Sequence, residues 1–156
     1  MLKKFNRSSK FSRSNDLDFE NILYVEDEDA NWNVAELHLR GKYNIKRARN
    51  AKEAFTMLGK EEFNLLLLDI QLAGSDYDGI EICKILRKRP GQPIPPEAKQ
   101  LNCETLPIVF VTAYSERYSK ESLLEVGGDE MVKKPVDFTR LTLVSSRLII
   151  KKIHQL

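Results

Sequence analysis

Acidic and polar side chains follow several apolar runs of the sequence. Glu26 and Asp27 come after one run, Asp69 follows four consecutive leucines, and Thr112 and Lys134 come after two further runs. Crowded carboxylates repel one another unless a cation joins them, and an all-oxygen cluster with room for water suits Mg²⁺. A carboxylate can attack phosphorus while the metal neutralises the charge of the transferred group. These residues therefore indicate phosphoryl transfer.

Lys134 and Thr112, the two side chains of this group that are not acidic, also suit phosphoryl transfer. Lys134 offers a compact cation for a carboxylate or a phosphate oxygen, and Thr112 offers a hydroxyl donor. Each acid taken alone is better explained as a helix cap or a loop charge. The joint pattern favours a functional site, because every apolar strand except the expected edge strand ends in such a side chain.

The elements that must position these side chains alternate between strand and helix patterns. Strands are expected over residues 22–25, 43–47, 63–69, 108–111 and 130–133, and helices over 30–40, 51–58, 79–89, 115–126 and after Asp137. In the first helix, Ala30, Val34 and Leu37 are expected to face inward. Residues 90–106 are rich in proline, which predicts a long surface loop.

This alternation predicts an α/β fold with a doubly wound, five-stranded parallel sheet of the flavodoxin-like (βα)5 type. The leucine run 65–68 has no polar face, so it is expected to be a central strand covered by helices on both sides. One sequence does not fix the strand order, and we expect the common order 2-1-3-4-5. In such sheets ligands bind at the carboxyl ends of the strands, where the polar side chains fall.

Composition limits the remaining possibilities. Residues 1–15 carry five basic and no acidic residues, so the rest of the chain has a net charge of −3. We expect residues 1–19 to be a flexible basic tail and residues 20–156 to be one domain. The mildly acidic domain favours neither nucleic-acid nor membrane binding. The two cysteines indicate no metal or disulfide framework, and a reduced cytoplasmic setting is expected.

Five stretches of the chain resemble the receiver domain of two-component response regulators. They are Ile22–Asp27, Leu65–Asp69, Asp78–Glu81, Pro107–Ala113 and Val132–Pro135, in the order and spacing of that family. The acidic pair followed by Asn31 is also similar to the receivers of hybrid histidine kinases. The resemblance covers residues 20–156 and implies a signalling module rather than a free-standing enzyme.

The resemblance implies a role for each matching residue. Asp69 would be the phosphoacceptor and a Mg²⁺ ligand, Asp27 a direct ligand, Glu26 a ligand acting largely through water, and Gln71 the donor of a backbone carbonyl. Lys134 would contact the phosphate and precede a cis bond to Pro135. Thr112 would report the phosphate, and the small Ala113 would leave room for it.

The chain departs from the family pattern at four places. Ala73 replaces the usual proline after the acceptor, and the loop from Asp69 to Asp78 is longer than the common form. The stretch 90–106 is an insertion, and Met131 replaces the aromatic residue of the usual switch. Without that ring, the signal is expected to pass through the loop after residue 112 and the following helix.

Two other classes of protein fit these residues less well than a phosphorylated receiver does. A pseudo-receiver that only binds partners would lack the acceptor, the acid pair or the lysine, all of which are present. A nucleotide-binding enzyme would need a glycine-rich loop after the first strand, where acids stand instead. A phosphatase of the haloacid dehalogenase type would need an acidic residue at position 71, where this chain has Gln71.

The receiver interpretation also implies partners. We expect phosphate from a histidine kinase or a phosphotransfer protein, an unidentified downstream protein target, and a monomer or weak homodimer. It implies no direct contact with nucleic acid.

Overall fold

The structure, a computed structural model, describes residues 19–113 and 116–155. Its strands are β1 (Glu20–Val25), β2 (Tyr43–Ala48), β3 (Leu65–Asp69), β4 (Ile108–Thr112) and β5 (Glu130–Lys133). Its α-helices are α3 (Asp29–Leu39), α4 (Ala51–Lys60), α5 (Gly79–Leu86), α6 (Lys120–Glu125) and α7 (Phe138–His154), with a short 3₁₀ helix η3 (Pro96–Ala98). Residues 1–18, most of the expected tail, lie outside the described part.

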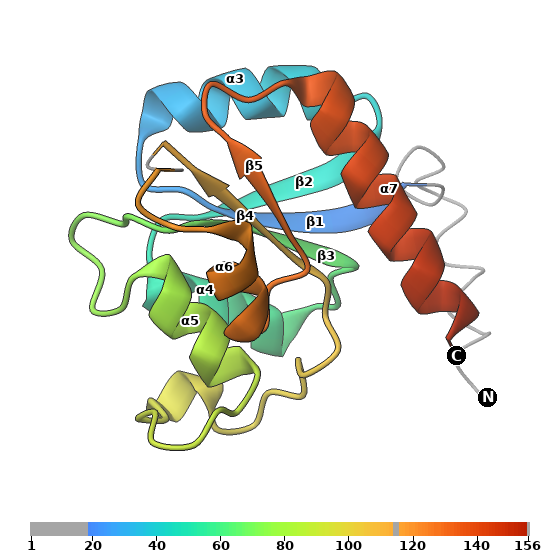
Figure 1. Ribbon diagram of the computed structural model, residues 1–156. Coiled ribbons are helices and arrows are strands. Elements are labelled where there is room, and N and C mark those ends of the chain that lie inside the picture. Colours follow the sequence, from blue (N-terminus) through green and yellow to red (C-terminus); the bar gives the residue numbers. More distant parts are fainter. Residues whose placement is uncertain (1–18, 114–115, 156) are drawn as a thin grey trace.

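The five strands form one parallel sheet in the order β2-β1-β3-β4-β5 (Figure 1), which confirms the expected fold and strand order. All four leucines of β3 are fully buried, as expected for a central strand. Asp69 pairs in register with Val111, and Thr112 pairs with Lys133. The carboxyl ends of β3, β4 and β5 therefore meet at the same edge of the sheet.

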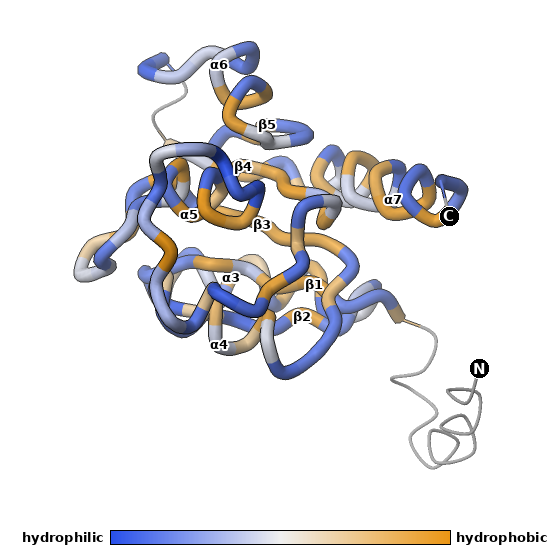
Figure 2. The backbone as a smooth tube through the Cα atoms, turned by 90° about the horizontal axis from the view of Figure 1, so that it is seen from below, coloured by the Kyte–Doolittle hydropathy of each residue, from blue (hydrophilic) through white to orange (hydrophobic). Residues whose placement is uncertain are grey.

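Helices cover both faces of the sheet and enclose an apolar core on each side. Helices α3 and α7 lie on one face, and α4, α5 and α6 lie on the other (Figure 1). Successive residues of β1 alternate between them, because Leu23 packs with the α4 side while Ile22 and Tyr24 pack with the α3 side. The strands of the interior are coloured as hydrophobic in Figure 2, which matches this burial. None of the described helices is long and apolar enough to cross a membrane.

Short polar side chains begin four of the helices, including α6, where Ser119 accepts from the Ser122 amide. Asn50 and Asp137 accept backbone hydrogen bonds at the starts of α4 and α7, as the sequence pattern predicts. At α5, Asp78 accepts from the Glu81 amide, and the Glu81 side chain accepts from the Asp78 amide. This capping box fixes the start of α5 beside the end of β3.

The inward face of α3 differs from the expected one. Ala35 and Leu39 are buried, whereas Val34 and Leu37 are 48% and 61% exposed and Ala30 is exposed as well. Residues 35 and 39 lie one turn apart on the same side of the helix, and residues 34 and 37 lie on other sides. The structure also shortens two expected helices, since α5 ends at Leu86 and α6 spans only Lys120–Glu125.

The proline-rich stretch 90–106 is not purely a surface loop, so that prediction was wrong in part. It contains η3, and its side chains Ala98, Leu101 and Leu106 are buried in the core on the α4 side. Proline prevents a long helix here, but it does not prevent the apolar residues between the prolines from packing. The stretch therefore contributes to the core of the domain.

The guanidinium of Arg87, at the end of α5, binds two separate segments. It donates to the Gly127 carbonyl (2.8 Å), to the carbonyls of Cys103 (2.9 Å) and Glu104 (3.0 Å), and to Asp129 (3.1 Å). The Arg87 side chain is only 10% exposed, although its partners Glu104 and Asp129 lie at the surface. Arg87 thus links the end of the 90–106 stretch to the turn between α6 and β5.

Candidate functional site

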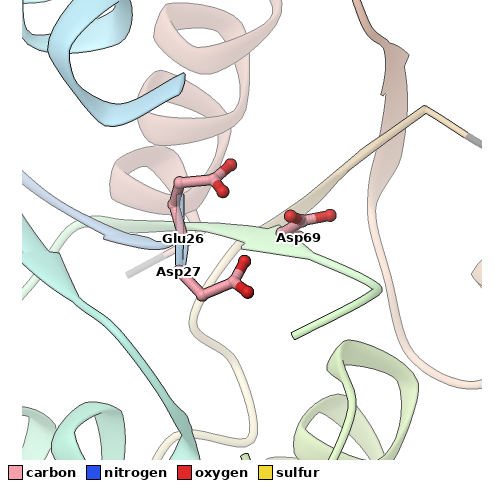
Figure 3. A group of neighbouring side chains, drawn as sticks. All are labelled: Glu26, Asp27 and Asp69. Carbon is pink, nitrogen blue, oxygen red and sulfur yellow. The ribbon is translucent and has the colours of Figure 1, made fainter. Parts of the chain in front are cut away.

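Three carboxylates gather at the carboxyl ends of β1 and β3. Glu26 and Asp27 follow β1, Asp69 ends β3, and their side chains extend into one region (Figure 3). Each residue offers a carboxylate oxygen, and these oxygens all lie within 4.8 Å of one another. Glu26 is fully buried, Asp69 is 6% exposed, and Asp27 is half-buried. Such crowding of negative charge requires compensation.

Lys134 supplies part of that compensation. Its ammonium group lies 2.9 Å from Glu26 Oε1 and 3.0 Å from Asp69 Oδ2, so it bridges the acids of β1 and β3. Burial alone would lower the pKa of Lys134, but the two carboxylates outweigh it and raise the pKa. The lysine is therefore held as a cation. The peptide bond from Lys134 to Pro135 is cis.

Asp69 and Glu26 respond differently to this environment. Burial, with the neighbouring charge of Glu26, raises the pKa of Asp69 to about 6 in spite of Lys134. Burial also acts to raise the pKa of Glu26, but hydrogen bonds from the Glu28 amide, Lys134 and Tyr24 hold it below its ordinary value. At neutral pH the site contains an ionised Glu26 and an Asp69 that is ionised less completely than an ordinary aspartate.

Both oxygens of Glu26 already have protein donors. Oε1 accepts from the Tyr24 hydroxyl (3.0 Å) and Lys134, and Oε2 accepts from the Glu28 amide (3.0 Å) and Asn31 Nδ2 (3.4 Å). Sequence reasoning gave Tyr24 no role in the site. The available signal was its position two residues before Glu26, since alternate residues of a strand share one face.

Asp27 is tied to the loop that follows β3. The Ala73 amide donates to Asp27 Oδ2 at 2.9 Å. Ala73 stands where the resembling family usually has proline, and proline has no amide hydrogen to donate. This departure from the family pattern therefore permits a direct link between the acid pair and the longer loop.

A cleft of about 750 Å³ opens over the acids. Its lining includes Asp27, Asp69, Gln71, Ala113, Tyr118 and Lys134. The structure thus brings the expected residues Asp27, Asp69, Gln71, Ala113 and Lys134 to one opening. Tyr118, a half-buried residue between β4 and α6, was missed because nothing in its local spacing marks it.

Two expected residues lie deeper. Thr112 is fully buried at the end of β4, one residue before the exposed Ala113. Met131 is half-buried in β5 and packs against the core on the α4 side of the sheet.

The carboxylates fit a hard divalent cation. They supply oxygen ligands only, their oxygens converge, and the open cleft leaves room for the waters that Mg²⁺ retains. Asp27 and Asp69 are the better candidates for direct contact, because the oxygens of Glu26 are engaged with protein donors.

Comparisons with known proteins agree with this geometry. Residues 22–145 match the family model described as the response regulator receiver domain. The response regulator ArlR of Staphylococcus epidermidis is 29% identical over 133 residues, which cover 85% of this chain and 53% of that protein. The regulatory protein VanR of Enterococcus faecium is 30% identical over 127 residues, covering 81% of this chain and 47% of that protein. The chain therefore spans about half the length of these curated relatives.

Solved structures show the same fold. A crystal structure of a proposed response regulator from Chloroflexus aurantiacus aligns with a TM-score of 0.71 and 28% identity, covering 85% of this chain and 98% of that one. The family model covers most of the chain and includes every element from β1 into α7. The chain belongs to the response regulator receiver domain family, the signalling modules of two-component systems.

Proposed function

We propose that Asp69 accepts a phosphoryl group from a histidine kinase or a phosphotransfer protein, with Mg²⁺ held at the acidic cleft. The observation that carries this proposal is the position of Asp69. It ends the central strand, opens to the cleft, and lies within reach of two further acids and the Lys134 ammonium. The phosphorylated module would then change its affinity for a downstream protein.

The other residues support the transfer in separate ways. A Mg²⁺ ion bound by Asp27, Asp69 and the Gln71 carbonyl would neutralise charge on the phosphoryl oxygens. Lys134 would contact one of those oxygens with its ammonium group. The hydroxyl of Thr112 would bind the phosphate, and Ala113 would keep the approach open. Glu26 holds Lys134 in place, which suits a carboxylate with no exposed surface.

A phosphorylation-independent interaction module remains the alternative. The exposed Val34 and Leu37 on α3 would suit a protein contact that needs no phosphate. However, such a module has no need for crowded carboxylates, which disfavour the folded state unless a cation joins them. The retained acid cluster therefore favours the phosphorylated receiver.

Phosphorylation of Asp69 has a direct test. With acetyl phosphate and Mg²⁺, the wild-type chain should gain the mass of one phosphoryl group, and Asp69→Asn should gain none, because the amide cannot attack phosphorus. Intact-mass spectrometry gives the readout. The matched control is Asp76→Asn, an exposed acid of the loop after β3, which should be phosphorylated like the wild type. Equal labelling of Asp69→Asn would disprove the assignment.

Metal binding has a separate test. Asp27→Asn removes one charged ligand, and we expect the dissociation constant for Mg²⁺ to rise at least about tenfold, the effect of roughly 1.4 kcal/mol. Asparagine retains an oxygen that can accept from the Ala73 amide, so the loop should stay in place. Calorimetric titration measures the affinity, with Asp76→Asn again as control. An unchanged affinity in Asp27→Asn would exclude this residue as a ligand.

A further inference from the structure

A second hollow lies at the opposite, amino-terminal edge of the sheet. It has a volume of about 430 Å³ between the end of α4, the segment 61–64, the segment 102–106 and the last turns of α7. We call it the lower groove. Its apolar lining includes Phe63, Leu106, Ile149 and Ile153. Ile153 is 51% exposed, so part of this apolar surface faces water in the described part of the chain.

The amino-terminal part of the chain reaches the domain beside this groove. The Asn21 amide donates to Asn64 Oδ1 (2.8 Å), and Asn21 Nδ2 donates to the Glu62 carbonyl (3.4 Å). Both Glu62 and Asn64 line the lower groove. The start of β1 and the end of α7 also lie on the same side of the sheet in Figure 1. The segment 1–18 therefore joins the described chain close to Asn21, which contacts the rim of the groove.

The segment and the groove complement each other in charge. Residues 1–15 contain five basic residues and no acid, while Glu61 and Glu62 line the groove with exposed side chains. Lys152 is the cation of the lining, and the segment also contains two acids of opposite charge, Asp16 and Asp18. Glu61 already pairs with Lys46, which leaves Glu62 as the more available acid.

Phe11 is the best placed apolar anchor of the segment. It lies between the basic residues Lys10 and Arg13 and eight residues before Phe19, a span of at most about 28 Å when extended. Phe5 has a longer tether, and Leu17 stands between two acids. A short tether gives a high effective concentration, so a weak intrinsic affinity suffices for docking.

We infer that the segment 1–18 docks reversibly in the lower groove, with Phe11 among the apolar side chains and its basic residues near Glu62. Reversible docking agrees with the polar composition that predicts a flexible tail. The inference does not depend on phosphorylation of Asp69, because the groove lies at the other edge of the sheet.

Cys103 gives a native probe of this docking. Cys103 lines the groove and is half-buried, whereas Cys83 is fully buried in the core. A small thiol reagent should therefore modify Cys103 in the folded full-length chain, and modification of Cys83 would report unfolding. If the segment covers the groove about 90% of the time, Phe11→Ser should speed the modification of Cys103 about tenfold. Leu2→Ser, the matched loss of an apolar side chain far from the tether, should leave the rate unchanged.

A second variant tests the charged part of the contact. Glu62→Gln should also speed the modification of Cys103, and Glu121→Gln on the distant α6 should not. Wild-type rates in both Phe11→Ser and Glu62→Gln would overturn the inference. A wild-type rate that falls as protein concentration rises would overturn it in favour of a second copy of the chain as the occupant. If Phe11→Ser exposes Cys83, then Glu62→Gln alone decides the outcome.

Discussion

Lys134→Met should destabilise the Mg²⁺-free domain at pH 7 by about 3–5 kcal/mol, the usual effect of removing one partner from a buried ion pair. Lys134 is 15% exposed and bridges Glu26 and Asp69, so its loss leaves two buried carboxylates without their cation. A loss of this size corresponds to a fall in melting temperature of roughly 10 °C for a domain of this length. Thermal unfolding followed by circular dichroism provides the measurement.

The pH dependence of this loss identifies its cause. In the wild type, the lowered pKa of Glu26 contributes stability above its unfolded pKa, and that stability is lost as the pH falls through the folded pKa. The raised pKa of Lys134 contributes stability at all pH values below its unfolded pKa. In Lys134→Met both carboxylates take up protons more readily, so the difference from the wild type should shrink between pH 7 and pH 5.

Added Mg²⁺ should also reduce the loss, because it replaces part of the missing positive charge. Lys133→Met is the matched control, since Lys133 is the exposed neighbour in β5. It should melt like the wild type at every pH. A Lys134→Met variant that shows the same loss at pH 5 and pH 7 would contradict an electrostatic origin.

Gly79→Ala should destabilise the domain by about 3 kcal/mol, at the upper end of the usual effect of overpacking. A Cβ atom at residue 79 would overlap the Asp69 carbonyl oxygen and stand 2.7 Å from Ile70 Cα. These are backbone atoms, so no flexible side chain can move aside. Helix α5 or the end of β3 must shift, and either movement displaces the proposed acceptor.

Two measurements follow from this clash. Chemical denaturation gives the loss of stability, and intact-mass spectrometry with acetyl phosphate should show slower phosphorylation than in the wild type. Gly41→Ala is the control, because a Cβ there meets nothing within 4 Å. A Gly79→Ala variant as stable as the wild type would show that the two segments approach less closely than described.

The architecture could be predicted because its signals are local and repeated. The apolar run of β3 predicts a strand buried on both faces. The alternation of strands with helices then leaves few possible topologies. Asp69 and Lys134 lie far apart in the sequence, yet both follow apolar strands. The rule that parallel strands end at one edge was enough to bring them together.

Other features depend on contacts that the sequence does not display. The inward face of α3 is set by its packing on β2 and α7, and its weak apolar pattern gave Ala30, Val34 and Leu37 the wrong side. In the sequence, Tyr24 has the pattern of an ordinary core residue. Only the structure shows its hydroxyl beside Glu26. The burial of Ala98 and Leu101 follows from their fit against α4, which proline content does not reveal.

The shared guanidinium of Arg87 has a mechanical consequence. One planar group holds both the end of the 90–106 stretch and the turn from α6 into β5. That turn leads directly to Met131, beside the route through which we expect phosphorylation to be signalled. A displacement of the turn must either move the stretch with it or break a hydrogen bond of Arg87. The stretch is thus coupled to this turn, so that a small movement of the turn can be passed on to the surface formed by residues 90–106.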